Sequence, residues 1–94
     1  MNKSEKDHLS KVASIGCIVC KLQGNEGTPA EIHHIRHGNG MSQRASNYDV
    51  IPLCQWHHRL GGYSVAIHAG RKEFESLYGT ELELLEQVRN LING

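Results

Sequence analysis

Two short motifs of metal-binding side chains constrain this sequence more than any other feature. Cys17 and Cys20 form a Cys-x-x-Cys pair, and Cys54 and His57 form a Cys-x-x-His pair with the same two-residue gap. This spacing lets both side chains of a pair reach one cation, and tetrahedral zinc takes four sulfur or nitrogen ligands of this kind. The two pairs together predict a structural Zn²⁺ site with three thiolates and one imidazole.

The number of cysteines supports the metal interpretation. The chain has 94 residues and three cysteines, and an odd number cannot pair completely, so we expect neither a disulfide framework nor a disulfide-linked partner. A domain this small commonly needs an additional stabilising element such as a metal. Cysteines that are merely small buried residues are an alternative, but it leaves the matched spacing unexplained. His58 in place of His57 is a second alternative, because Cys-x-x-x-His is also a permitted zinc spacing.

Charge and hydropathy exclude several classes of protein. Ten Lys and Arg residues balance ten Asp and Glu residues, which excludes a strongly basic protein that coats nucleic acid but not a local basic site. The longest apolar runs fall well short of the roughly 18 residues that a membrane span needs. We therefore expect a protein without a membrane partner.

The pattern of apolar residues and turn residues predicts one small α+β domain with a short β-hairpin and flanking helices. Helical segments are predicted over residues 4–15, 55–60, 71–78 and 80–92. Strands are predicted over 30–35 and 48–53, loops over 21–29 and 36–47, and residues 64–69 are ambiguous. Ser4 with Asp7 and Thr80 with Glu83 have the spacing of capping boxes at helix starts. Pro52 indicates an edge position or a strand end for the second strand.

Several candidate ligands remain after the zinc site is assigned: His33, His34, His58, His68 and Asp49. Neighbouring side chains of a strand point to opposite faces, so the adjacent His33 and His34 cannot easily hold one ion together. We therefore expect one of them to bind a metal and the other to stay free to accept a proton. His58 directly follows the predicted zinc ligand His57, so it faces elsewhere and could complete a second site.

Residues 31–35 (EIHHI) and 49–58 (DVIPLCQWHH) resemble the HNH, or ββα-metal, endonucleases. By this resemblance, His33 and His58 take positions of catalytic metal ligands, and His34 takes that of the general base. Asp49 takes the middle position, where the family has Asn. The four predicted zinc ligands take the structural zinc positions that many members carry, with His57 in place of a fourth Cys. The resemblance implies a metal-dependent endonuclease in a zinc-stabilised ββα-metal fold.

Further runs look like the phage recombination-enhancement (Ref) nucleases, HNH-type enzymes that cut DNA where the RecA recombinase filament has acted. These runs are PAEIHHIR at 29–36, GMSQRA at 40–45, IPLC at 51–54, HHR at 57–59, GGY at 61–63 and HAG at 68–70. The resemblance implies DNA as the substrate, a RecA-type filament as a partner, a phage or prophage origin and a cytoplasmic location. We expect one nuclease domain over 1–94, with a short N-terminal segment at 1–8 and C-terminal helices at 71–94.

The implied reaction is metal-assisted hydrolysis of a phosphodiester bond. His34 would remove a proton from the attacking water, and one divalent ion at His33 and His58 would contact the scissile phosphate. Imidazole ligands favour zinc or manganese over magnesium, but the family often uses magnesium, so Mg²⁺, Mn²⁺ and Zn²⁺ all stay open. Asp49 would orient His34 or its neighbourhood. His68 stays open between a third metal ligand, a phosphate contact and a half-buried histidine without a chemical role.

Four cationic side chains flank the predicted site and are candidates for DNA binding: Arg36, His37, Arg44 and Arg59. Guanidinium groups bind phosphate well, and phosphate contacts carry no base information, so we expect weak sequence preference. Arg44 and Arg59 could instead be ordinary surface charges.

A function of another class also fits the sequence. This function is a zinc-stabilised nucleic-acid-binding or recombination accessory module without catalysis, in which the second group of histidines is occupied or idle. Separately, His33 and His34 could be a merely structural pair. The nuclease is favoured because a binding module does not need a free histidine beside a second ligand set.

Overall fold

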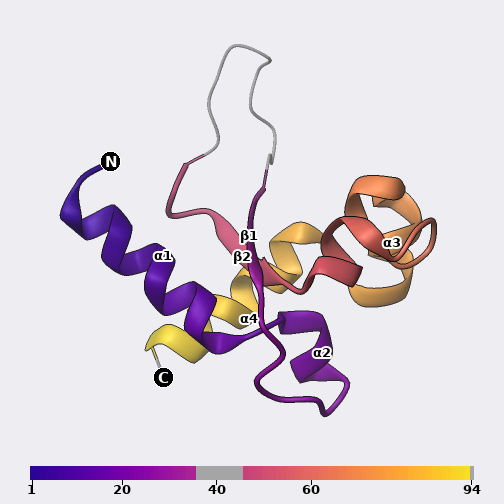
Figure 1. The fold of residues 1–94 in the computed structure, drawn as a ribbon, viewed down its shortest axis with the longest axis horizontal. Helices are drawn as coiled ribbons and strands as arrows, with labels where there is room; N and C mark the ends of the chain where they lie inside the picture. The colour runs from indigo at the N-terminus through magenta and orange to yellow at the C-terminus, as the bar shows by residue number, and fades with distance from the viewer. Residues whose placement is uncertain (36–45, 94) are drawn as a thin grey trace.

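The computed structural model describes residues 1–35 and 46–93, in which a two-stranded antiparallel sheet lies among helices (Figure 1). Helices α1 (Lys3–Ile15) and α2 (Ile18–Leu22) come first, followed by strands β1 (Glu31–His34) and β2 (Val50–Leu53). The π-helical turn η1 (Trp56–Leu60), the 3-10 turn η2 (Ile67–Ala69) and helices α3 (Arg71–Tyr78) and α4 (Glu81–Asn93) complete the chain. The prediction of a small α+β domain with a hairpin and flanking helices is confirmed.

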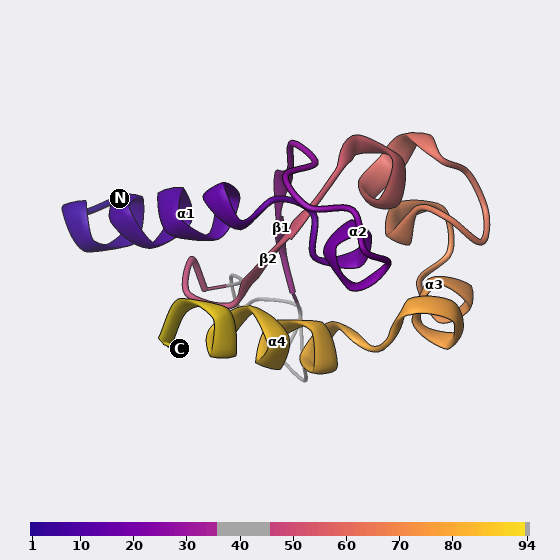
Figure 2. The ribbon, with the colours of Figure 1, turned by 90° about the horizontal axis from the view of Figure 1, so that it is seen from below.

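Strand β2 is the centre of the hydrophobic core. All four of its residues are buried, because α1, α2 and α4 all contact this strand. Figure 2 shows the strands passing between α1 and α4. The largest buried side chains are those of Val12, Ile18, Val19, Ile35, Val50, Ile51, Leu53, Phe74, Leu84 and Val88. The core therefore fixes the two strands and, through them, the side chains at their ends.

The register of the hairpin determines which histidine is buried. His33 is paired with Ile51 and His34 with Val50. His33 is buried and His34 is exposed, as the alternation of side chains along a strand requires. Pro52 is paired with Ile32, and its missing N–H is tolerated because each strand of a two-stranded sheet has an unpaired edge.

Helix α1 begins earlier than the sequence pattern predicts. Its N-cap is Asn2, whose side-chain oxygen accepts a hydrogen bond from the backbone N–H of Glu5 at 2.8 Å. The carboxylate of Glu5 accepts one in return from the Asn2 backbone at 3.2 Å. The predicted Ser4–Asp7 capping box is therefore wrong, since the reciprocal pair forms two residues earlier, between Asn2 and Glu5. Ser4 instead accepts a hydrogen bond from the Tyr48 hydroxyl at 3.0 Å.

Other predicted helix boundaries agree more closely with the structure. Helix α3 covers the predicted range 71–78. The Thr80–Glu83 capping box at α4 is confirmed, because the Glu83 N–H donates to Thr80 Oγ1 at 3.1 Å and the Thr80 N–H donates to the Glu83 carboxylate at 2.9 Å. Helix α2 was not predicted from the sequence, and it ends at Leu22, two residues into the predicted loop.

The segment between β2 and α3 folds back tightly on itself. The predicted helical turn at 55–60 forms as η1, and the ambiguous residues 64–69 end in η2, which contacts η1. A Cβ at Gly61 would lie 2.4 Å from Val65 Cγ1 and 2.6 Å from the Trp56 carbonyl oxygen. Glycine at this position therefore allows the close return that brings η2 beside η1.

The two ends of the chain are helical. Residues 3–8, expected to form a short N-terminal segment, are the first turns of α1, and α3 and α4 lie within the expected C-terminal segment. Within residues 1–35 and 46–93, every helix is too short or too polar to cross a membrane.

Candidate functional site

Four candidate metal ligands meet in the interior beside α2. Cys17 caps the N-terminus of α2, Cys20 lies within it, Cys54 follows β2, and His57 lies on η1. The Nδ1 atom of His57 is 3.6 Å from the sulfur of Cys17, 3.6 Å from that of Cys20 and 3.2 Å from that of Cys54. We call these four residues the cysteine quartet. All four side chains are buried.

The spacing within the cysteine quartet fits a tetrahedral zinc ion. With zinc–sulfur bonds of about 2.3 Å and zinc–nitrogen bonds of about 2.0–2.1 Å, ligand atoms lie about 3.5–3.8 Å apart. The distances from His57 Nδ1 to the sulfurs of Cys17 and Cys20 lie in this range, and the 3.2 Å to the Cys54 sulfur is shorter. The sulfurs of Cys20 and Cys54 are 3.8 Å apart, far beyond a disulfide bond, and all three cysteines are free. The quartet could therefore hold a metal such as zinc. His57, and not His58, is the histidine that joins the sulfurs.

Burial disfavours charge on two side chains of the cysteine quartet. Burial raises the pKa of Cys17 to about 12 and lowers the pKa of His57 below its ordinary value. Both shifts favour neutral groups, because charged groups lose solvation in the interior. A divalent cation supplies the positive charge that stabilises thiolate ligands at such a site.

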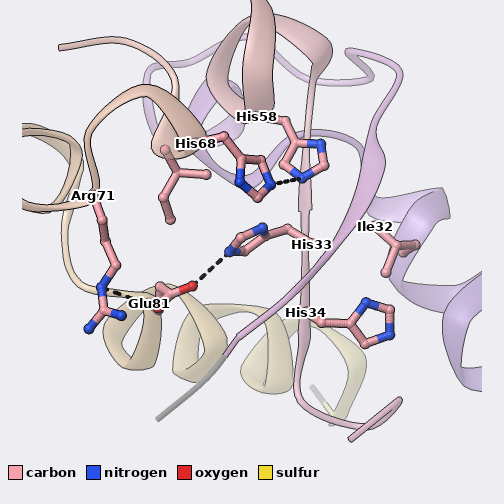
Figure 3. Close-up of a pocket in the computed structure, with 8 residues that line it drawn as sticks. Ile32, His33, His34, His58, His68, Arg71 and Glu81 are labelled. Atoms are coloured by element: carbon pink, nitrogen blue, oxygen red, sulfur yellow. Dashed lines mark hydrogen bonds and ion pairs between the residues drawn. The ribbon is translucent and has the colours of Figure 1, made fainter. Parts of the chain in front are cut away.

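Three histidines from three separate elements form a second group. His33 comes from β1, His58 from η1 and His68 from η2, and candidate ligand atoms of all three lie within 4.8 Å of one another. We call these residues the histidine trio. Figure 3 shows their three rings close together. The trio lines a pocket of about 610 Å³. The Nε2 atoms of His58 and His68 are 2.9 Å apart, which fits a hydrogen bond or two adjacent ligands of one ion.

Carboxylates fix two rings of the histidine trio. Glu31 accepts a hydrogen bond from His58 Nδ1 at 2.7 Å, and Glu81 accepts one from His33 Nε2 at 2.7 Å. In each ring the nitrogen that donates is thereby assigned, and the other nitrogen keeps its lone pair. Such a carboxylate–histidine arrangement orients metal-binding imidazoles and raises their basicity. Burial, together with the nearby His58 and His33, lowers the pKa of His68, which favours its neutral, ligand-competent form.

Two arginines lie behind these carboxylates. Arg59 donates through Nη2 to Glu31 at 2.7 Å and through Nε at 3.0 Å, and Arg71 Nε lies 3.6 Å from Glu81. The hydrogen bonds from Arg59 and His58 lower the pKa of Glu31 to about 2, so this carboxylate stays charged as an acceptor. Arg59, predicted as a DNA contact, is thus also engaged with a carboxylate of the site.

His34 lies next to the histidine trio but points in a different direction from His33 (Figure 3). It is exposed and lines the same pocket. Its Nε2 atom is 2.8 Å from the side-chain oxygen of Asn47. The carboxylate of Asp49 accepts from Arg89 Nη2 at 2.7 Å, and its backbone carbonyl accepts from the Ile35 N–H at 3.0 Å. The structure therefore brings Asn47 to His34 and ties Asp49 to α4 and to the end of β1.

Sequence reasoning missed three polar partners of the site. Glu81 is only 6% exposed although it is charged, and its position on the first turn of α4 gives no sign of burial against β1. Glu31 lies two residues before His33 on the same strand, so its side chain is expected on the same face, and this partner could have been predicted. Asn47 lies two positions before Asp49 and has the residue type expected at the middle position. The predicted DNA contacts Arg36, His37 and Arg44 lie outside the described residues.

Comparison with known proteins identifies the family of the chain. The sequence profile of the family described as "Recombination enhancement, RecA-dependent nuclease" matches residues 2–93, which include the cysteine quartet, the histidine trio and His34. The chain belongs to this family. The family description names a nuclease that depends on RecA.

A curated relative of this family member has been found in Escherichia coli strain K12. The chain is 39% identical over 62 residues to "Uncharacterized protein YdfU", and the match covers 63% of this chain but 16% of the relative. The chain thus spans a small part of that longer protein, whose name states no activity.

Proposed function

We propose that this protein is a metal-dependent DNA endonuclease of the HNH, or ββα-metal, type, with β1, β2 and η1 as the ββα unit. One observation carries the proposal: imidazoles from β1, η1 and η2 meet in an open pocket, separate from the buried cysteine quartet, although η1 contributes one histidine to each group. His57 and His58 are adjacent but belong to different groups. This separation supports a structural Zn²⁺ at the quartet and a catalytic divalent ion at the histidine trio.

The catalytic ion is proposed to bind the nitrogens that the carboxylates leave available. These are Nδ1 of His33 and Nε2 of His58, because the other nitrogen of each ring donates to Glu81 or Glu31. His68 is the third proposed ligand, since its Nε2 lies beside that of His58. A bound divalent ion, Mg²⁺, Mn²⁺ or Zn²⁺, would stabilise the charge that develops on the scissile phosphate and the leaving oxygen.

His34 is the proposed general base. It is exposed at the pocket, lies next to a proposed metal ligand and is fixed by Asn47, so it could take a proton from a water that attacks the phosphate. Asp49 is proposed to orient the backbone around His34 rather than the imidazole ring of His34 itself. Its carbonyl extends the hairpin pairing and its carboxylate holds Arg89 of α4, which fixes the backbone next to His34.

DNA is proposed to bind through phosphate contacts at the open side of the pocket. Arg36, His37, Arg44 and Arg59 are the proposed contacts, of which Arg59 has 51% of its side chain exposed while it holds Glu31. Phosphate contacts would give little sequence preference. The family description names dependence on RecA, which supports a RecA-type filament as the partner that presents the DNA. We also propose that the protein is phage-derived and acts in the cytoplasm.

The decisive experiment is plasmid nicking with added Mg²⁺ or Mn²⁺ by wild type, His34→Ala and His8→Ala. His8 is the matched control, because it lies on α1 against the Tyr48 ring and away from the trio. We expect nicking by wild type and His8→Ala and its loss in His34→Ala. Equal nicking by all three proteins would remove His34 from the mechanism. If no protein nicks DNA with either ion, with or without a RecA filament, the non-catalytic binding module is favoured.

A further inference from the structure

A chain of three side chains joins helix α1 to His34. The Glu5 Oε2 atom accepts a hydrogen bond from Asn47 Nδ2 at 2.7 Å, and the Asn47 Oδ1 atom lies 2.8 Å from His34 Nε2. Glu5 and Asn47 are both partly buried. The contact spans 42 residues of sequence and connects the first turn of α1 to the end of the segment that precedes β2.

The chemistry of these groups determines the direction of each hydrogen bond. An ionised carboxylate only accepts, so the amide nitrogen of Asn47 must face Glu5 and the amide oxygen must face His34. An amide oxygen also only accepts, so His34 Nε2 must carry the hydrogen. The lone pair of the neutral ring then lies on Nδ1, which is the nitrogen able to take a proton.

Glu5 has a spare oxygen for this contact. As the third helical residue of α1, it caps the helix through Oε1, which accepts from the Asn2 backbone. Capping does not require the Oε2 contact to Asn47. The hydrogen bond from Asn47 is the main cause that lowers the pKa of Glu5, which favours the charged carboxylate that accepts from the amide.

We propose that Glu5 is a positioning residue that acts through Asn47 to keep the proton of neutral His34 on Nε2 and the lone pair on Nδ1. The relevance to catalysis rests on the proposed nuclease function. Without Glu5, the Asn47 amide can turn over at little steric cost and present Nδ2 to the ring. His34 Nε2 must then accept a hydrogen bond, so the ring hydrogen moves to Nδ1. Nδ1 then has no lone pair with which to take a proton.

The test measures the tautomer of His34 directly in the full chain. Long-range ¹H–¹⁵N NMR of ¹⁵N-histidine-labelled protein identifies the protonated ring nitrogen at a pH well above the ordinary imidazole range. We expect Nε2–H in wild type and loss of this preference in Glu5→Ala. Nicking by Glu5→Ala should fall about 10- to 100-fold, the usual range for partners that orient a reactive side chain.

Two further variants separate positioning from helix capping. In Glu5→Ala with Asn47→Asp, the new carboxylate can accept from His34 Nε2 without Glu5, so the wild-type tautomer and most of the nicking rate should return. Asn2→Ala removes the other half of the capping box and keeps the Glu5–Asn47 contact. It should lower the melting temperature and leave both the tautomer and the nicking rate unchanged.

The inference is overturned if Glu5→Ala leaves the hydrogen on Nε2, if the double variant fails to restore it, or if nicking does not follow the tautomer. These outcomes differ from failure of the proposed function. If wild type cleaves no DNA but the tautomer still responds to Glu5, the control of the ring stands and the nuclease proposal fails.

Discussion

The cysteine quartet and the histidine trio share the turn η1 but differ in every property that matters for chemistry. The quartet is sulfur-rich and buried on all sides, and its ligand atoms have the spacing of a closed tetrahedron. The trio uses imidazoles alone and lies in an open pocket. A closed site has no position for a substrate, whereas an open one does. One region is suited to holding the chain folded and the other to binding a substrate.

The second difference lies in what surrounds the ligands. His58 and His33 of the trio donate to the carboxylates of Glu31 and Glu81, while the Cys17 sulfur receives the backbone N–H of Cys20 at 3.5 Å. Carboxylates tune the basicity of imidazoles that bind exchangeable ions, and backbone N–H groups hold thiolates in place. Each region therefore carries the supporting groups that suit its proposed role.

Loss of the cysteine quartet should have the largest effect. Cys54→Ser removes one zinc ligand, and structural zinc contributes on the order of 10–16 kcal/mol, compared with a total stability of about 5–14 kcal/mol for a domain of this size. We expect loss of the helical circular dichroism signal in Cys54→Ser, and in wild type with excess chelator. His58→Ala is the matched control and should keep the signal. A Cys54→Ser protein that stays helical would contradict the structural role of the quartet.

Loss of one trio ligand should abolish activity without loss of the fold. We expect His58→Ala to nick plasmid DNA more than about 100-fold more slowly, beyond the effect of removing an outer partner, because the ion loses a direct ligand. Its zinc content should stay at one ion per chain, since His57 still completes the quartet. Wild-type nicking rates in this variant would exclude the trio as the catalytic metal site.

The sequence allowed the quartet to be predicted better than the trio, for physical reasons. The two ligand pairs of the quartet are local, and the fixed gap in each pair requires only a short turn. The choice between His57 and His58 depended on the π-helical geometry of η1, which local spacing does not determine. The hairpin and helices α3 and α4 could likewise be predicted, because the apolar periodicity is local.

The partners of the site could not be predicted because they come from distant segments. Glu81 meets His33 across 48 residues, and Asn47 meets His34 while bound to Glu5 of α1. Nothing in the local sequence of α4 indicates that its first turn packs against β1. The earlier start of α1 is a related case, since Asn2 and Ser4 are both good N-cap residues.

Removal of an outer carboxylate should have a smaller effect than removal of a ligand. Glu81→Gln keeps the shape of the side chain but weakens the fixation of His33, so we expect metal affinity to fall about 10- to 100-fold. The concentration of Mn²⁺ that gives half-maximal nicking measures this change. Glu86→Gln, at an exposed position of the same helix, should leave it unchanged. Equal values for both variants would mean that Glu81 does not support the trio.

The smallest predicted effect is on stability at acidic pH. Glu31 has a pKa of about 2, below its ordinary 4.5, because Arg59 and His58 donate to it. Its contribution to stability is therefore present above about pH 4.5 and is lost as the pH falls toward 2. In Arg59→Gln we expect the pKa of Glu31 to rise toward the ordinary value, measured by NMR titration of the side-chain carboxyl carbon. An ordinary pKa for Glu31 in wild type would contradict the described contact.

The central claim is that the quartet and the trio are two independent coordination spheres. A crystal structure of the zinc-containing protein soaked with Mn²⁺, with anomalous data that distinguish the two metals, tests it most directly. The account predicts zinc at Cys17, Cys20, Cys54 and His57, with the imidazole nitrogen about 2.0–2.1 Å away. It predicts a second ion bound by His33, His58 and His68. A single ion that shares sulfur ligands with His33 would contradict the account.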